Sequence, residues 1–102
     1  MPNSSSNVKE KQRIDTNEPH LYEVIFLNDD FTPMDFVTLI LIEIFNLNYT
    51  EAEELMMKVH LEGKARVGTY PYDIAVSKAA KATAIARNND FPLRIIVRKT
   101  GL

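Results

Sequence analysis

The stretch that decides the fold is Asn28-Asp29-Asp30-Phe31-Thr32-Pro33-Met34, where strand-like sequence gives way to helix-like sequence. Before it, residues 22–27 are rich in aromatic and β-branched side chains, which is typical of a β-strand. Within it, Thr32 has the hydroxyl of a helix N-cap, and Pro33 suits the first helical position, where no N–H is needed. The sequence therefore predicts a polar turn that joins a strand to a helix beginning at Pro33.

Two helices are expected after the turn. Residues 36–45 are apolar around nearly the whole circumference of a helix, which is typical of a central helix. Thr50 and Glu53 form a capping-box pattern ahead of a second helix over residues 51–62. Gly63 suits the left-handed C-cap of that second helix.

The second half of the chain adds two strands and a helix. Residues 65–70 alternate weakly between apolar and polar side chains, as in a short strand. Pro71 opens a third helix with many small side chains, which ends at residues 88–90. Residues 93–98 give the last strand. The order β-α-α-β-α-β predicts an α+β fold, a two-layer sandwich in which a small three-stranded antiparallel sheet packs on three helices.

The length of 102 residues allows one domain with a single core. Residues 1–20 are mostly Ser, Asn and charged side chains, with only Val8 and Ile14 as sizeable apolar groups. Such a segment buries too little apolar surface to offset the entropy lost on ordering. We therefore expect a flexible N-terminal arm over residues 1–20 and a folded core over residues 21–102.

The composition argues against several classes of partner. Lysine and arginine number 12 against 14 aspartates and glutamates, so the formal net charge is −2 and no general positive field attracts nucleic acid or anionic lipid. The absence of cysteine excludes disulfides and thiolate metal ligands. Neither a signal-peptide pattern nor an apolar run long enough to cross a bilayer is visible. We expect a monomeric, soluble, cytoplasmic protein that binds neither nucleic acid nor membranes.

Asn28, Asp29 and Asp30 gather three amide or carboxyl side chains at one turn. One interpretation is turn chemistry, in which these side chains accept hydrogen bonds from their own backbone. The other is a site for a primary ammonium group, which has three donors and no acceptor and needs about three oriented acceptors when it leaves water. His60, on an otherwise apolar helix face, would supply a further acceptor.

His60 also has two interpretations. A cationic imidazole near a helix C-terminus interacts favourably with the last carbonyls and the helix dipole. To bind an ammonium group, His60 must instead be neutral and accept through one ring nitrogen, so binding should weaken as His60 becomes protonated. Apolar side chains flank the turn; they are most often core, although two methionines beside a polar turn also suit an adaptable pocket. These side chains belong to Met34, Val37, Met56, Val59 and Leu93.

The sequence gives little support for an enzyme. No Ser or Cys nucleophile stands in a recognisable setting, no phosphate loop is present, and the only imidazoles are those of His20 and His60. A metal site can be drawn from Asp29, Asp30 and His60, but the spacing is not diagnostic. We therefore expect a non-catalytic protein that needs no cofactor.

Four ordered blocks of sequence resemble the ClpS family, the adaptors that hand N-degron substrates to the Clp ATPase-protease. The resemblance covers residues 21–93, most of the folded part. The blocks are Asn-Asp-Asp-Phe-Thr-Pro-Met-Asp-Phe-Val at 28–37, then Met56, Val59, His60 and Gly63, then Gly68, Tyr70, Asp73, Ile74, Ala75 and Lys78, and finally Phe91-Pro92-Leu93. Because the blocks occur in order and at compatible spacing, together they make a specific match.

The resemblance implies a site for the N-terminus of a substrate protein. It implies that Asn28, Asp29 and His60 bind the free α-amino group and the first peptide bond. It also implies a pocket for the first side chain, with a preference for Phe, Leu, Tyr and Trp. The implied pocket residues are Asp30, Thr32, Met34, Val37, Met56, Val59 and Leu93. Met34 matches the family's gatekeeper, and a wall at the mouth rejects Ile and Val, whose bulk lies at the first side-chain carbon.

The resemblance further implies docking to the N-terminal domain of a ClpA- or ClpC-type AAA+ unfoldase, through a surface away from the pocket. By motif position, Asp73 and Lys78 are the candidate docking residues. Asp73 stands where the family usually has Glu, and Val76 stands where it often has a second acid. The alternative function is a non-catalytic interaction domain of ribosomal-stalk-like fold, in which the turn is only structural and no N-degron pocket exists.

Overall fold

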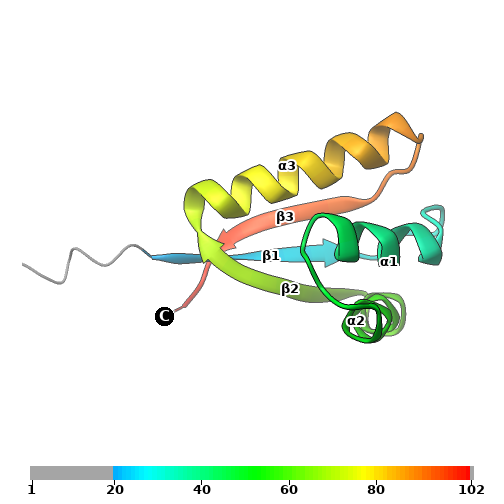
Figure 1. Cartoon of the computed structure of the whole chain (residues 1–102), viewed down its shortest axis with the longest axis horizontal. Coiled ribbons are helices and arrows are strands. Elements are labelled where there is room, and N and C mark those ends of the chain that lie inside the picture. The colour runs from blue at the N-terminus through cyan, green and yellow to red at the C-terminus, as the bar shows by residue number, and fades with distance from the viewer. Residues whose placement is uncertain (1–19, 102) are drawn as a thin grey trace, which may run out of the picture.

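Figure 1 shows the computed structural model of the chain, which describes residues 20–101. Its elements are β1 (Leu21–Leu27), α1 (Met34–Glu43), α2 (Tyr49–Glu62), β2 (Lys64–Pro71), α3 (Tyr72–Asn88) and β3 (Arg94–Lys99). The predicted order of elements and the two-layer α+β class are confirmed, and the bounds of the strands and the third helix agree with prediction to within one residue. The expected flexible arm lies outside the described residues, apart from His20.

β1 is the middle strand of an antiparallel sheet with the order β2-β1-β3. Because successive side chains of a strand point to opposite faces, Val24 and Phe26 share one face, and both are fully buried in the core. Phe26 pairs with Ala65 of β2 and with Ile95 of β3. The most apolar strand of the sequence therefore occupies the centre of the fold.

The opposite face of the sheet carries Glu23 between two arginines. Glu23 Oε2 accepts a hydrogen bond from Nε of Arg98 at 2.7 Å, and Glu23 Oε1 lies 3.9 Å from Nη1 of Arg66. Both arginine side chains are largely exposed, so each ion pair contributes little to stability. Their role is to satisfy the carboxylate that the middle strand places on this face.

α3 lies along the sheet and contacts all three strands (Figure 1). Its buried side chains are all small, which lets the helix backbone approach the sheet closely; they belong to Ala75, Ala79, Ala82 and Ala86. α1 and α2 pack against each other, and α2 also contacts β2. Figure 1 shows both helices near the end of the sheet at which β1 finishes.

α1 differs from the expected central helix. Pro33 occupies its N-cap position and makes no side-chain hydrogen bond, while the hydroxyl of Thr32, one residue earlier, donates to Oδ2 of Asp29 at 2.8 Å. The prediction of Thr32 as the cap was therefore wrong: the helix begins at Met34, and Thr32 belongs to the turn that the carboxylate of Asp29 organises. Leu39 is half exposed, so α1 is buried on one side only, and β1 holds the centre of the molecule.

α2 begins earlier than expected. Its capping box consists of Asn48 and Glu51, not of Thr50 and Glu53: Asn48 Oδ1 accepts from the Glu51 N–H at 2.8 Å, and Glu51 Oε1 accepts from the Asn48 N–H at 3.0 Å. Asn and Thr are both good N-caps, so the two overlapping patterns were equivalent in the sequence. Gly63 ends α2 with a left-handed φ of +91°, as predicted.

Candidate functional site

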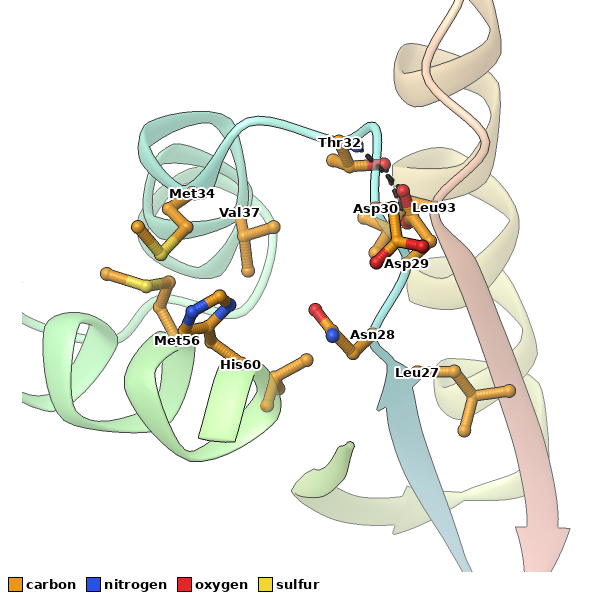
Figure 2. Close-up of a pocket in the computed structure, with 11 residues that line it drawn as sticks. Leu27, Asn28, Asp29, Asp30, Thr32, Met34, Val37, Met56, His60 and Leu93 are labelled. Atoms are coloured by element: carbon orange, nitrogen blue, oxygen red, sulfur yellow. Dashed lines mark hydrogen bonds between the residues drawn. The ribbon is translucent and has the colours of Figure 1, made fainter. Parts of the chain in front are cut away.

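A pocket opens at the carboxyl end of β1, between the loop that follows this strand and the helices α1 and α2 (Figure 2). Its volume is ≈ 250 Å³. Pockets for drug-sized ligands typically hold about 300–1,000 Å³, so this one fits a single amino-acid side chain. The lining residues are Leu27, Asn28, Asp29, Asp30, Thr32, Met34, Val37, Met56, Val59, His60 and Leu93.

All ten residues that the family resemblance assigns to the substrate site line this one pocket. They come from the loop after β1, from α1, from α2 and from the residue before β3. Of the lining residues, only Leu27 was not predicted. It is the last residue of β1 and directly precedes Asn28, so its place at the strand end was the signal that could have identified it.

The carboxylate of Asp29 organises the loop after β1. Its Oδ1 accepts hydrogen bonds from the backbone N–H groups of Phe31 at 2.8 Å and Thr32 at 2.7 Å, and its Oδ2 accepts from the Thr32 hydroxyl at 2.8 Å. Burial raises the pKa of Asp29, but these hydrogen bonds and the charge of Arg87 outweigh it and hold the pKa below its usual value. Asp29 thus accepts hydrogen bonds from its own turn, as the first interpretation expected. Its Oδ2 atom still has a lone pair for one further donor.

Asn28 and His60 face each other across the mouth of the pocket (Figure 2). The backbone N–H of Asn28 donates to the carbonyl oxygen of Gly63 at 2.9 Å, which ties the end of β1 to the end of α2. The N–H of Gly63 in turn donates to the carbonyl of Val59 at 2.9 Å. These two bonds fix the backbone on both sides of the mouth. The side-chain amide of Asn28 and the imidazole of His60 therefore both point into the mouth of the pocket.

Apolar side chains enclose the rest of the cavity. Val37, Met56 and Val59 are buried, and Leu93 is only 1 % exposed, so these four residues form the deep walls. Met34 is 46 % exposed and therefore stands on the open side. The pocket passes from a polar mouth to an apolar interior, which suits a ligand with a polar head and an apolar body.

Asp30 is the exposed acid of the loop and lines the same pocket as Asp29 and His60. Within residues 20–101, no group of three His, Cys, Asp or Glu side chains is arranged to hold a metal ion. What the two carboxylates provide is negative charge and acceptor atoms beside the mouth. Both favour a cationic ligand.

The two candidate docking residues lie on α3, away from the pocket. Asp73 is exposed in the first turn of this helix. Lys78 is half-buried: its Nζ donates to the carbonyl oxygen of Ile44 at 2.8 Å and lies 5.9 Å and 5.6 Å from the ring centroids of Phe45 and Tyr70. The amine of Lys78 is therefore engaged within the molecule, where it joins α3 to the chain that follows α1.

Residues 17–96 match the family model described as ATP-dependent Clp protease adaptor protein ClpS. The chain belongs to the ClpS family. A ClpS relative from Treponema denticola is 57 % identical over 82 residues, which cover 80 % of this chain and 81 % of the relative. A ClpS relative from Vibrio atlanticus is 47 % identical over 88 residues, which cover 86 % of this chain and 83 % of the relative.

A solved structure of a ClpS protein shares the fold. The structure of Agrobacterium tumefaciens ClpS2 bound to L-phenylalaninamide matches this ClpS-family chain with a TM-score of 0.79 and 37 % sequence identity, and covers 81 % of this chain and 100 % of that chain. The chain is thus an adaptor protein of the Clp protease, and this assignment replaces the alternative of a ribosomal-stalk-like interaction domain. Within residues 20–101, no helix is both long and apolar enough to cross a membrane.

Proposed function

We propose that this ClpS-family chain binds the free N-terminal amino group and the bulky hydrophobic first residue of N-degron substrates, and delivers them to the AAA+ unfoldase of a Clp protease. The observation that carries the proposal is the pocket itself. Asn28 and His60 face each other across its mouth, and the cavity behind them is apolar and of side-chain size (Figure 2). A polar head and an apolar body are the two parts of an N-terminal amino acid.

The α-ammonium group belongs at the mouth. It brings three donors, and the acceptors offered to it are the side-chain oxygen of Asn28, a ring nitrogen of neutral His60 and the remaining lone pair of Asp29 Oδ2. The negative charge of Asp29 and of Asp30 adds a favourable interaction with the cation. An acetylated N-terminus lacks the charge and two of the donors, so these acceptors would lose their partners.

The first side chain belongs between the buried Val37, Met56, Val59 and Leu93. Burying a Phe or Leu side chain completely is worth about 1.5–3 kcal/mol, which is a large share of the affinity for a short peptide. L-phenylalaninamide, the ligand in the Agrobacterium structure, combines a free α-amino group with a phenylalanine side chain. That a relative of the same fold binds this molecule supports the same class of ligand for this chain.

Met34 is placed to exclude β-branched first residues. Its side chain stands on the open side of the pocket, where the first side-chain carbon of the ligand would enter. Phe, Leu, Tyr and Trp are narrow at this carbon, whereas Ile and Val carry a second substituent there. Selectivity would then come partly from steric exclusion at the mouth.

Delivery requires a second surface, and we place it at the start of α3. Asp73 is exposed there, and the neighbouring Tyr72, Ile74 and Val76 add apolar area that a partner domain would cover. Lys78 would act indirectly by anchoring the helix through Ile44 and Phe45. The partner is the N-terminal domain of a ClpA- or ClpC-type unfoldase.

The deciding experiment is fluorescence anisotropy with three labelled peptides that differ at the N-terminus. One begins with free Phe, one is its Nα-acetylated twin, and one begins with free Ile. We expect saturable binding of the first peptide and at least tenfold weaker binding of the other two. The acetylated peptide lacks the free amino group, and the Ile peptide has a β-branched first side chain. Equal affinity for the free and acetylated peptides would contradict recognition of the amino group.

A further inference from the structure

The loop between α3 and β3 is held by several hydrogen bonds. α3 ends in a Schellman motif: the N–H of Phe91 donates to the carbonyl of Ala86 at 2.9 Å, and the N–H of Asp90 donates to the carbonyl of Arg87 at 3.0 Å. Asp90 takes the left-handed position of the motif with a φ of +62°. This geometry turns the chain sharply back toward the sheet, so that Leu93 arrives at the pocket.

Arg87 adds a second restraint to the same loop. Its Nη1 donates to the carbonyl oxygen of Phe91 at 2.9 Å and to that of Leu93 at 2.8 Å. One guanidinium nitrogen therefore bridges two carbonyls that lie on either side of Pro92. Phe91 in turn packs edge-to-face on Phe36 of α1, with ring centroids 4.8 Å apart, so the loop is also fixed from the opposite side.

The restraint by Arg87 matters for the pocket because it acts on Leu93. Leu93 is almost completely buried and forms a deep wall of the cavity, and its own carbonyl is one of the two that Arg87 holds. Arg87 does not line the cavity. A side chain outside the pocket thus fixes the backbone of a buried residue that lines the pocket.

We propose that Arg87 is a positioning residue of the substrate pocket, which sets the discrimination among first side chains by holding Leu93 in place. This inference rests on the proposed function. When the bridge is lost, the 91–93 segment can shift, and the deep wall moves with it. A Phe ring is longer than a Leu side chain and reaches further toward that wall, so binding of Phe should change more than binding of Leu.

The charge of Arg87 also acts on the loop after β1, because it is among the causes that hold the pKa of Asp29 low. One cation therefore supports both the loop that carries Leu93 and the acid that organises the turn after β1. A lysine would keep this charge, but on a flexible stem without the planar fork of a guanidinium. We therefore expect the affinity of Arg87→Lys for the Phe peptide to lie between those of wild type and Arg87→Met.

The test compares Arg87→Met with Arg94→Met. Arg94 is an exposed arginine on β3, directly after Leu93, so both variants lose one positive charge from the same region but only one loses the bridge. Affinities for peptides beginning with Phe and with Leu are measured by anisotropy. We expect Arg87→Met to weaken the Phe peptide about tenfold and to reduce the preference for Phe over Leu, since hydrogen bonds from charged donors are lost. Arg94→Met should stay within about twofold of wild type, as for most surface changes.

A double-mutant cycle with Leu93→Ala tests whether Arg87 acts through Leu93. In the Leu93→Ala background, Arg87→Met should no longer change the ratio of the Phe and Leu affinities, because the wall that it positions is absent. An unchanged ratio in the Arg87→Met single variant would overturn the inference, and so would equal losses in the Arg87→Met and Arg94→Met variants.

A measurement without peptide separates this inference from the proposed function. The methyl resonances of Leu93 are recorded by NMR in the free proteins, and they should move in Arg87→Met but not in Arg94→Met. If the wild type bound no peptide, the proposed function would fail while the Leu93 resonances still reported whether Arg87 positions this side chain. Unmoved Leu93 resonances in a folded Arg87→Met variant would overturn the positioning role, whatever the peptides do.

Discussion

At the scale of single residues, His60 offers the most direct test of the amino-group site. It faces Asn28 across the pocket mouth and lies on the exposed side of α2 (Figure 2). A hydrogen bond to a charged group contributes about 1.5–3 kcal/mol, so His60→Ala should weaken the Phe peptide by about 10- to 150-fold. Anisotropy titration measures this, with Leu61→Ala as the control because Leu61 is exposed next to His60 and does not line the pocket. Unchanged affinity in His60→Ala would remove His60 from the site.

Met34 leads to a different prediction, which concerns the exclusion of peptides that begin with Ile or Val. Met34→Ala removes the side chain on the open side of the pocket without touching the polar mouth. We expect the variant to gain measurable binding to peptides beginning with Ile or Val, while the Phe peptide loses about tenfold or less through lost contact area. Competition against the labelled Phe peptide measures both effects. Continued rejection of Ile by Met34→Ala would place the exclusion elsewhere.

Asp29 connects the pocket to stability. Its pKa in the folded protein lies below the usual value of 3.8, so ionised Asp29 stabilises the fold at pH values above 3.8, and this contribution is lost as pH falls through the lower, folded-state pKa. Asp29→Asn lacks this titration. We expect the variant to unfold in less urea than wild type at pH 7, and the difference to shrink below pH 3.8. A difference that stays constant down to about pH 2.5 would contradict the role of the charge.

Which residues line the pocket could largely be predicted from the sequence, whereas their detailed contacts could not. The resemblance named ten of the lining residues because short motifs carry them, whereas Leu27 precedes the first motif, and only its place at the end of the strand pointed to the pocket. The internal role of Lys78 was missed for a related reason. It depends on the carbonyl of Ile44, which is 34 positions away in the chain and carries no sequence signal.

At the scale of elements, the junction of α2 and β2 controls one side of the pocket. Gly63 has a φ of +91° and accepts the backbone hydrogen bond from Asn28. No atom lies within 4 Å of the place that a Cβ would take at this position, so any penalty for substitution is conformational and not steric. Gly63→Ala should therefore destabilise the protein by about 1–2 kcal/mol, and Gly63→Asn by less, because Asn tolerates left-handed backbone better. Urea unfolding measures the loss of stability in both variants. A smaller loss for Gly63→Asn supports the conformational explanation, whereas equal losses would contradict it.

Elements were predicted well where one pattern dominated and less well where two patterns overlapped. β1 and α3 have unambiguous signals, a run of aromatic and β-branched residues and a proline followed by spaced alanines. The start of α2 had two equivalent capping boxes, and the helix adopts the one at Asn48. At the start of α1, Thr32 lies in the turn organised by Asp29 and not at the N-cap, a detail that the sequence pattern does not show.

At the scale of the whole molecule, the two proposed surfaces lie at opposite ends. The pocket is at the end of the sheet where β1 finishes and α1 and α2 lie, whereas α3 starts at the other end, where the described chain also begins and finishes (Figure 1). Asp73 and Lys78 are five residues apart, which is about 140° around a helix, so they do not share one face. In the proposed docking mode, Asp73 would therefore contact the unfoldase, whereas Lys78, bonded to the carbonyl of Ile44, would support the helix from within.

This separation predicts that cargo and unfoldase bind independently. Asp73→Arg should weaken binding to the isolated N-terminal domain of the unfoldase at least tenfold through charge reversal, while the affinity for the Phe peptide stays within about twofold of wild type. Conversely, saturating N-terminal domain should raise the anisotropy of the bound peptide, because the complex is larger, without changing its Kd. Asp35→Arg is the matched control, because Asp35 is an exposed acid in the first turn of α1, at the opposite end of the molecule from Asp73. Competition between peptide and domain, or equal loss of domain binding in the Asp35→Arg control, would show that docking does not use the start of α3.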